Sequence, residues 1–308
     1  MPHGHKTLLK WKLVTGVSIL AMASPTLLAE SINPPTTPQI ASMNASESQN
    51  LDMVLNWWRE VLRARHAELA EKYQAEDYIQ HDPNVPTGRA AFVKFFSSFG
   101  PPINPIPATL SPAPVVKGAK GDFVWLIFEH QAKTHRFNSF EIIRIQNGKV
   151  QEHWDSEKKR PGTPAFIPSS AAPPSKWPAG KLSKEERHNS KLAAEAFKDM
   201  LQYAHPELAD KIVDRDYIQH NPNVPQGRDG LKQAMSQIAQ APEAIKPEWK
   251  DAPALTLASG PFVVMMWHRK EKDPSDPNKE YIWNHYDAIR IENGLIKEHW
   301  DEENLASR

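Results

Sequence analysis

Two Glu-His-Trp-Asp segments, which end at Asp155 and Asp301, could carry acid–base chemistry. Alternate side chains of a strand share a face, so His153 would lie beside Asp155, and His299 beside Asp301. An imidazole next to a carboxylate suits enolisation, in which one group removes a proton and another handles the developing oxyanion. The structural alternative is a core histidine with satisfied hydrogen bonds and an aspartate that caps or solvates the end of a strand.

The chain contains the same domain twice. The block that begins Tyr78-Ile-Gln-His returns 139 residues later at Tyr217, and Asn147-Gly…His-Trp-Asp155 returns 146 residues later at Asn293. The second copy therefore holds about seven extra residues, around Lys270 to Lys279. A repeat of this length is a duplicated globular domain, because solenoid units repeat every ~20–50 residues. Positions kept in both copies serve the shared fold or a shared chemistry.

Further paired candidates lie in the first block. His81 and His220 stand between a glutamine and an Asp/Asn-Pro turn. Each could reach across a pocket mouth and titrate near neutral pH, or it could hydrogen-bond to the turn backbone. Tyr78 and Tyr217 are candidates for core or pocket wall, and Trp125 is a further candidate for ligand binding.

Polar residues ahead of the Asn-Gly pairs form the second set of candidates. Asn138 and Asn284 could polarise a ligand carbonyl or form hydrogen bonds at the start of a strand. Glu141 and Asp287 could line a pocket together with the last-strand aspartate, in which case one of the two acids would have a raised pKa. Alternatively, they face solvent and pair with the arginines three residues further on.

The sequence predicts neither a metal nor a cofactor. His81, His153 and Asp155 are of ligand type, but zinc or iron requires three or four convergent ligands. The chain has no His-x-His or His-Glu-x-x-His signature, no glycine-rich phosphate loop and no nucleophile elbow. It also lacks cysteine, which excludes disulfides, thiol nucleophiles and thiolate zinc sites.

Three helices and then strands must position these residues. Apolar residues at helical spacing predict the first helix, at Leu51, Val54, Leu55, Trp58 and Leu62 and at Leu192, Ala194, Phe197 and Leu201. A second helix follows His66 or His205, and a third follows the Tyr-Ile-Gln-His block. Continuous apolar runs over 123–128 and 262–267 predict strands that are covered on both sides. The Asn-Gly pairs predict a hairpin into the last strand.

Composition and segment pattern give the organisation. Lysines followed by a short apolar run predict a signal peptide over 1–29, cleaved near Ala29, so the mature protein would be secreted or periplasmic without stable membrane insertion. A membrane anchor is the alternative, but the run is shorter than the ~20 residues of a span. The predicted order is then a flexible lead-in over 30–48, domain 1 over 49–158, a Pro-rich linker over 159–183 and domain 2 over 184–308. A formal net charge of zero argues against nucleic acid as a partner.

The pattern of helices and a meander ending in Asn-Gly-x-x-x-Glu-His-Trp-Asp resembles the SnoaL-like branch of the NTF2-like superfamily. The resemblance implies α+β architecture: tandem cone-shaped domains, each with three helices packed on a curved antiparallel sheet. In polyketide cyclases of this family a last-strand aspartate, matching Asp155 and Asp301, is the acid/base of an aldol closure without metal or cofactor. A histidine of those cyclases matches Glu141 and Asp287, where this sequence departs. NTF2-like domains usually pair sheet to sheet, which implies an intramolecular pseudo-dimer.

Two functions of different class follow from these residues. The first is an exported acid/base enzyme of the lyase or isomerase kind, acting on a small apolar carbonyl compound. The second is a non-catalytic protein that binds a small-molecule ligand in the same pockets. In a third possibility, one copy has lost its site and serves only for packing.

Overall fold

The computed structural model describes residues 34, 36–164, 180–237 and 241–302. The predicted signal peptide and the central part of the predicted linker lie outside these residues. Within the described part of the chain, no helix is both long and apolar enough to span a membrane.

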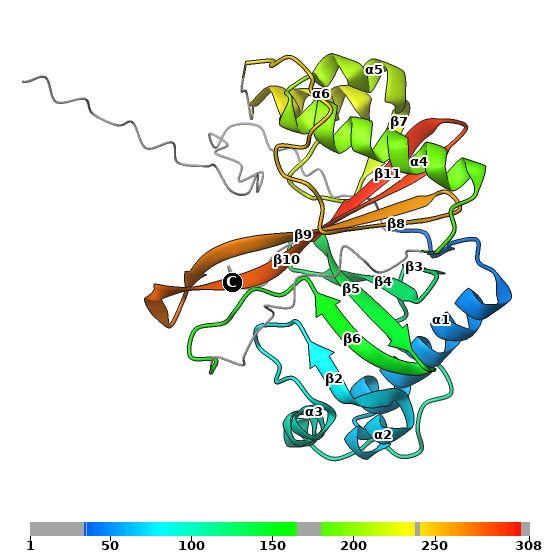
Figure 1. Cartoon of the computed structure of the whole chain (residues 1–308), viewed down its shortest axis with the longest axis vertical. Helices are drawn as coiled ribbons and strands as arrows, with labels where there is room; N and C mark the ends of the chain where they lie inside the picture. The colour runs from blue at the N-terminus through cyan, green and yellow to red at the C-terminus, as the bar shows by residue number, and fades with distance from the viewer. Residues whose placement is uncertain (1–33, 35, 165–179, 238–240, 303–308) are drawn as a thin grey trace, which may run out of the picture.

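The first domain packs its helices on one face of a six-stranded sheet (Figure 1). Its helices are α1 (Ala45–Trp57), which continues as the π-helix η1 (Trp58–Arg63), then η2 (Ala67–Leu69), α2 (Ala70–Tyr73), α3 (Arg89–Phe96) and η3 (Ser97–Phe99). Its strands are β1 (Gln39–Ile40), β2 (Gln74–Gln80), β3 (Val116–Lys120), β4 (Phe123–Gln131), β5 (Arg136–Gln146) and β6 (Lys149–Asp155), in the spatial order β1-β3-β4-β5-β6-β2.

The second domain repeats this connectivity. Its helices are α4 (Lys184–Ala194), η4 (Glu195–Gln202), η5 (Pro206–Leu208), α5 (Ala209–Ile212) and α6 (Gly227–Gln237). Its strands are β7 (Val213–Gln219), β8 (Leu255–Ser259), β9 (Phe262–Asp273), β10 (Asp276–Glu292) and β11 (Leu295–Asp301), in the order β7-β11-β10-β9-β8. The predicted tandem α+β architecture is therefore confirmed.

The sheets differ from the prediction at one edge. The central strands are antiparallel, but β2 runs parallel to β6, and β7 runs parallel to β11. The Tyr-Ile-Gln part of the repeated block forms the last three residues of each of these edge strands. From the sequence, we expected a motif between helices at this position and no strand. The strand was missed because charged residues such as Glu76 and Asp77 are exposed at the sheet edge, which obscures an alternating apolar pattern.

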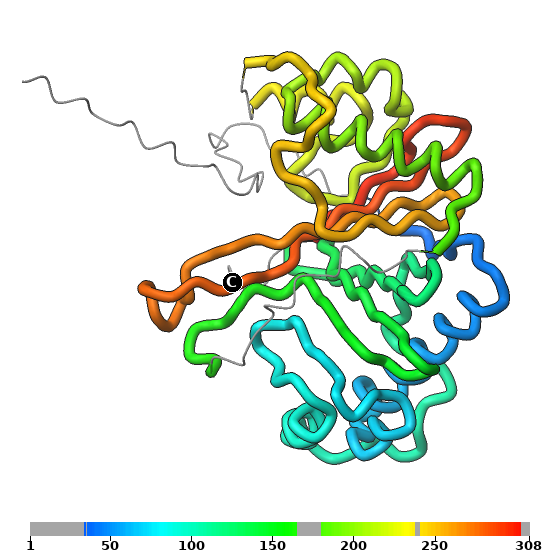
Figure 2. The backbone as a smooth tube through the Cα atoms, viewed as in Figure 1, coloured from blue at the N-terminus to red at the C-terminus, as the bar shows by residue number. Residues whose placement is uncertain are grey.

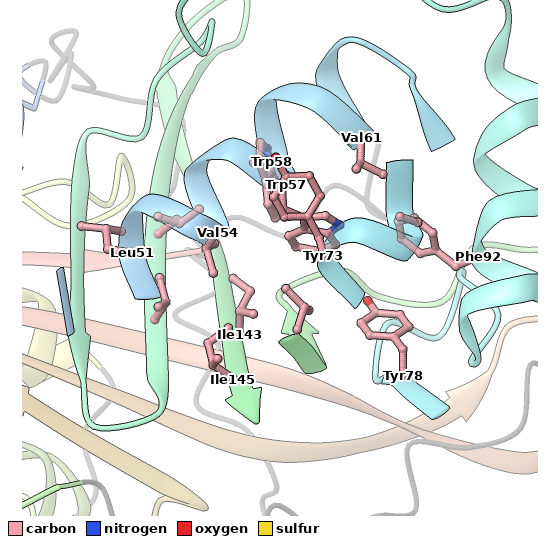
Figure 3. Packing of buried hydrophobic residues seen from close by; sticks show 14 of the residues in the cluster. Leu51, Val54, Trp57, Trp58, Val61, Tyr73, Tyr78, Phe92, Ile143 and Ile145 are labelled. Atoms are coloured by element: carbon pink, nitrogen blue, oxygen red, sulfur yellow. The ribbon is translucent and has the colours of Figure 1, made fainter. Parts of the chain in front are cut away.

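Three apolar cores hold the two domains. In the first, α1, η1, α2 and α3 cover one face of their sheet, as the packing of Leu51, Val54 and Trp57 over Ile143 illustrates (Figure 3). The second core repeats this arrangement. The third core lies between the sheets, where Phe140 of β5 stacks on Tyr286 of β10 with ring centroids 5.3 Å apart. The two sheets thus pack back to back with their helices outside (Figure 2).

The described part of the predicted lead-in is ordered, contrary to the expectation of a flexible segment over 30–48. Gln39–Ile40 forms the edge strand β1, and α1 begins at Ala45 with Asn44 as its N-cap. Thr36 is buried between the domains, where its hydroxyl lies 3.1 Å from Nδ1 of His220 and accepts a hydrogen bond from Nε1 of Trp300. Together with the pairing of β1 with β3, these contacts hold the segment against both domains.

The extra residues of the second copy extend a hairpin instead of lengthening its loop. Strands β9 and β10 together run from Phe262 to Glu292, and their tip projects from the body beside the end of domain 1 (Figure 1). Lys159 forms an ion pair with Asp273 of this arm, and the backbone N–H of Gly162 donates to Ser275 Oγ at 2.8 Å. The insertion therefore attaches the arm to the segment that follows Asp155.

Candidate active site

In domain 1, three acid–base side chains converge on the sheet face that packs against the helices. Glu141 of β5 and Asp155 of β6 are direct cross-strand partners, and His153 lies two residues before Asp155. Nε2 of His153 is 2.7 Å from Oε2 of Glu141. The ring of His153 meets those of Trp57 and Trp58 edge-on, at centroid distances of 5.8 Å. The alternation expected from the sequence thus brings His153 and Asp155 together inside the first domain.

Domain 2 builds the same cluster from β10 and β11. Asp287 and Asp301 are cross-strand partners, and Nε2 of His299 is 2.8 Å from Oδ1 of Asp287. In both copies the residue in the position of Glu141 faces inward. The sequence left open whether these acids face solvent, and the geometry selects the inward alternative.

A glutamine sets the protonation of the histidine in domain 1. Oε1 of Gln80 accepts hydrogen bonds from the backbone N–H groups of His81 and Asp82, which fixes the orientation of the amide. Its Nε2 therefore donates to the Tyr78 hydroxyl and lies 3.1 Å from Nδ1 of His153. Nδ1 must then be the acceptor, so a neutral His153 carries its proton on Nε2 and donates it to Glu141.

The corresponding glutamine in domain 2 presents the opposite atom. Nδ1 of His299 lies 3.1 Å from Oε1 of Gln219, while its Nε2 faces Asp287. Both ring nitrogens meet acceptors, which is the arrangement of a protonated imidazolium. The two clusters therefore hold their histidines in different charge states.

The pKa values in domain 1 follow from burial. Burial lowers the pKa of His153 to about 4, and it raises the pKa of Glu141 and Asp155 well above the usual range. The charge of the nearby Asp82 adds to the rise for both acids. The first cluster is thus a set of carboxyl groups that favours protonation, around a neutral imidazole.

Two residues that the sequence did not single out change this balance in domain 2. His285 lies 3.2 Å from Asp287 and 2.6 Å from Glu302. Burial acts to lower the pKa of His285, but these two carboxylates raise it well above its usual value. Burial likewise acts to raise the pKa of Asp287, yet the charges and hydrogen bonds of His285 and His299 lower it.

Asp301 differs from its neighbour Asp287, because burial raises its pKa to about 6. The corresponding positions to His285 and Glu302 in domain 1 are Ser139 and Ser156. A direct comparison of the two copies at these positions was the signal that could have identified the pair from the sequence.

His81 and His220 do not belong to the clusters, contrary to the expectation that they reach across the pocket mouth. Each is the residue after an edge strand and lies on the opposite side of the last strand. Nε2 of His81 is 3.1 Å from Glu152, and its ring stacks on Trp154 with a centroid distance of 4.5 Å. His220 packs in the same way on Trp300. Strand alternation places these tryptophans between the sheets, and the histidines follow them.

Asn138 and Asn284 also lie between the domains instead of facing a ligand pocket. Nδ2 of Asn284 donates to the backbone carbonyl of Asp155 at 3.2 Å, and Nδ2 of Asn138 donates to that of Asp301 at 3.3 Å. Each asparagine thus holds the cluster aspartate of the other domain.

The aromatic candidates divide between the cores. Tyr78 and Tyr217 are buried beside the clusters, and each hydroxyl accepts a hydrogen bond from the glutamine two residues later. Trp125 is fully buried in the core between the sheets, which corrects its prediction as a ligand-binding residue. On β4, alternation gives Val124 and Leu126 to the helix-covered face and therefore turns Trp125 away from the cluster.

The clusters also contain metal-ligating atoms. Ligand atoms of Glu141, His153 and Asp155 lie within 4.8 Å of one another, as do those of the corresponding trio in domain 2. A metal at His153 Nε2 would need the lone pair that the present tautomer fills with a proton. A metal ion bound there would displace this proton and would require both carboxyl groups to ionise.

A groove of about 540 Å³ lies elsewhere, between the starts of α1 and α4. Its lining includes Asn44, Lys120, Ser183 and Glu186 and contains no residue of either cluster. The groove is a weaker candidate for the active site than the clusters, because its charged residues Lys120 and Glu186 already form an ion pair with each other.

Comparison with known proteins gives a family match for the second domain. Residues 191–307 match the family model described as SnoaL-like polyketide cyclase. No curated protein matches the chain.

Similar solved structures each span about one copy. They include TsrD from Streptomyces laurentii (19% identity, 40% of this chain and 90% of that chain, TM-score 0.26). Another is a putative SnoaL-like polyketide cyclase from Jannaschia sp. CCS1, with 10% identity over 42% of this chain and 93% of that chain and a TM-score of 0.32. A third is a putative polyketide cyclase from Acidithiobacillus ferrooxidans, with 17% identity over 37% of this chain and 89% of that chain and a TM-score of 0.24.

Proposed function

We propose that the chain is a cofactor-independent acid–base enzyme, a proposal supported by the match of residues 191–307 to the family model described as SnoaL-like polyketide cyclase. Its substrate would be a small apolar carbonyl compound, and its reaction an aldol closure or an isomerisation. Asp155 and Asp301 would exchange protons with the substrate, while His153 and His299 would set the charge beside them.

One observation carries this proposal: each domain buries an acid–His–acid cluster against an apolar core. Asp155 is 8% exposed and His153 is 5% exposed, beside tryptophan rings. Burying carboxyl groups costs several kcal/mol unless they are protonated or well paired. Such perturbed groups concentrate at functional sites, because catalysis needs proton donors and acceptors that titrate near the working pH.

The alternative is a binding protein that uses the same clusters to recognise a ligand without changing it. Buried polar groups in an apolar surround also give specificity for a ligand that carries a matching donor or acceptor. The two functions differ in whether the ligand is consumed.

The test is a thermal-shift screen of the mature chain from about Glu30 against small carbonyl and aromatic compounds. Wild type is compared with Asp155→Asn and Asp301→Asn. A ligand at one hundred times its dissociation constant adds about 2.7 kcal/mol to the free energy of unfolding. An enzyme consumes the ligand, and one Asn variant binds it without turnover. If all three proteins bind the ligand and return it unchanged, the binding protein is the correct function.

The duplication would act as an intramolecular pseudo-dimer, in which each sheet covers the other. The apolar residues between the sheets support this, since a single domain would expose them to solvent. The mature chain should therefore elute as a monomer in size-exclusion chromatography with light scattering. A stable dimer of the full chain would contradict this prediction.

Export is proposed from the lysines and the short apolar run ahead of Ala29. N-terminal sequencing of the protein recovered from a secreting host should begin near Glu30. An uncleaved chain in the membrane fraction would instead support the anchor alternative.

A further inference from the structure

The cluster of domain 2 groups three side chains whose atoms can bind a metal ion. Asp287 of β10 and Asp301 of β11 are cross-strand partners, and His299 lies two residues before Asp301. Their ligand atoms all lie within 4.8 Å of one another, and Oδ1 of Asp287 is 2.8 Å from Nε2 of His299. Zinc binds nitrogen and oxygen ligands at about 2.0–2.2 Å, so two of its ligands lie roughly 3–4 Å apart. The spacing of the trio thus suits a single ion.

The hydrogen bonds of His299 are those of a metal-binding histidine. Oε1 of Gln219 accepts a hydrogen bond from the backbone N–H of Asn221 and lies 3.1 Å from Nδ1 of His299. Nδ1 therefore carries a proton, and Nε2 needs a cation between itself and the carboxylate of Asp287, either a second proton or a metal ion. A metal-bound histidine usually donates its other ring N–H to an acceptor in this way. The nitrogen that faces Asp287 is thus the one that can bind an ion.

The histidine of domain 1 has the opposite arrangement. Nδ1 of His153 lies 3.1 Å from the amide nitrogen of Gln80 and must accept, so neutral His153 carries its proton on Nε2. Nε2 then donates to Glu141 at 2.7 Å. The free lone pair of the ring faces Gln80 and not the carboxyl groups, so the first cluster offers an ion no nitrogen ligand in this state.

The two carboxylates of domain 2 also have supports that domain 1 lacks. Nε2 of His285 lies 3.2 Å from Oδ2 of Asp287, which leaves Oδ1 for the ion. Nδ2 of Asn221 donates to Oδ2 of Asp301 at 2.6 Å. Carboxylates that bind a metal are commonly held by such hydrogen bonds. In domain 1 the residues at the positions of His285 and Asn221 are Ser139 and Asp82.

Charge and exposure in domain 2 agree with a divalent ion. Asp287 and Asp301 supply two negative charges, which balance the two positive charges of the ion. His285 has a carboxylate of its own, because its Nδ1 lies 2.6 Å from Glu302. The side chains of His299 and Asp287 are 12% and 10% exposed, so the cluster is not sealed from solvent.

We propose that Asp287, His299 and Asp301 bind one divalent transition-metal ion, and that the cluster of domain 1 does not. Zn²⁺ suits this set, because it accepts imidazole nitrogen together with carboxylate oxygen. The protein ligands are Oδ1 of Asp287, Nε2 of His299 and a carboxylate oxygen of Asp301, and water takes the fourth position. His285 and Asn221 are positioning residues, which hold the two carboxylates.

The metal site goes beyond the proposed acid–base function, because it concerns binding without turnover. While the ion is bound, Asp301 exchanges no protons, so the acid–base reaction falls to Asp155 of domain 1. The sequence carries no close-spaced ligand signature for this site, because the ligands come from two strands and meet only through the register of β10 with β11.

The test is isothermal titration calorimetry with ZnCl₂ on the mature full chain, after treatment with EDTA and removal of the chelator. Wild type should bind one ion per chain. His299→Ala should lose this binding, whereas the matched change His153→Ala in domain 1 should keep it. His285→Ala removes a support and no ligand, so it should weaken binding about 10- to 100-fold.

A second measurement uses wild type alone, so it stands even if a variant fails to fold. Histidine rings are labelled with ¹⁵N and followed by NMR as Zn²⁺ is added, with signals assigned through ring-to-backbone connectivities. The Nε2 signal of His299 should move on zinc binding, while its Nδ1 keeps a proton. The two ring signals of His153 should stay where they are.

Three results would overturn the proposal. The first is a wild-type protein that binds no zinc, and the second is undiminished binding by His299→Ala, which would place the ion at exposed histidines such as His205. The third is equal involvement of His153 and His299. Neither measurement needs a substrate, so a chain that binds zinc but consumes no ligand would reject the proposed enzyme and keep the metal site.

Discussion

At the residue scale, the neighbouring groups of each buried acid set its pKa and therefore its charge. Asp287 and Asp301 face each other across β10 and β11, yet their pKa values move in opposite directions. Asp287 has His285 and His299 as partners, and Asp301 has an amide and further acids nearby. The same residue type therefore performs different electrostatic roles within one cluster.

Asp301→Asn should stabilise the protein at high pH. Burial raises the folded-state pKa of Asp301 to about 6 from 3.8, so the folded protein binds its proton more tightly than the unfolded chain. The free energy of unfolding then falls as pH rises from about 4 to 6, and the penalty persists above pH 6. Removing the acid should add about 1–3 kcal/mol at pH 8 and little below pH 4. Urea unfolding at pH 3.5, 6 and 8 measures this.

Asp287→Asn is the matched control, with the opposite sign. Because the pKa of Asp287 is lowered in the folded protein, its ionised carboxylate stabilises the fold at every pH above its pKa in the unfolded chain. This stabilisation is lost only as the pH falls below that value. The variant should be destabilised at pH 8, because His285 and His299 lose their shared carboxylate. Equal responses of the two variants to pH would refute this account of the cluster.

At the element scale, the last strand of each domain separates two environments by alternation. On β6, His153 and Asp155 face the helix-covered core, and Trp154 faces the other sheet. On β11, His299 and Trp300 divide in the same way. One strand thus supplies both the candidate chemistry and the packing between domains.

The β9–β10 arm is expected to order the end of domain 1. Shortening it by about seven residues over 273–279, to the length of the first copy, removes the contacts of Asp273 and Ser275 with Lys159 and Gly162. Amide hydrogen exchange over 157–162 should then accelerate, because the backbone N–H of Gly162 loses its acceptor and Lys159 loses the ion pair that anchors the segment. Hydrogen exchange with mass spectrometry measures the change.

Ser275→Ala is the smaller matched change, since it removes only the bond to Gly162. It should accelerate exchange at Gly162 alone. If the shortened arm leaves exchange over 157–162 unchanged, the arm has no ordering role.

At the scale of the whole molecule, packing the sheets back to back joins the two clusters. Asn284 holds the carbonyl of Asp155, and Asn138 holds that of Asp301. Each cluster is therefore supported from the other domain.

Asn284→Ala should disturb the first cluster although it changes the second domain. Loss of the donor leaves the Asp155 carbonyl without this bond, at an expected cost of about 1 kcal/mol in unfolding free energy. The ¹³C carboxyl signal of Asp155 should shift more than that of Asp301, and Asn138→Ala should give the reverse. Exposed Asn278→Ala is the control, and shifts confined to the mutated domain would contradict the coupling.

The sequence by itself determined the duplication, the α+β class and the shared face of His153 with Asp155. These follow from local regularities: repeated blocks, helical spacing, Asn-Gly turns and strand alternation. The alternation also placed Trp154 away from His153, and the structure agrees.

Only the tertiary structure decided which distant residues complete each cluster. Gln80 reaches His153 because β2 pairs with β6, and Asn284 reaches the backbone carbonyl of Asp155 because the sheets pack back to back. His81 and Trp125, which the sequence offered as pocket candidates, lie between the sheets for the same reason. Strand pairing and sheet packing join residues far apart in the chain, and no local periodicity records which pairs will meet.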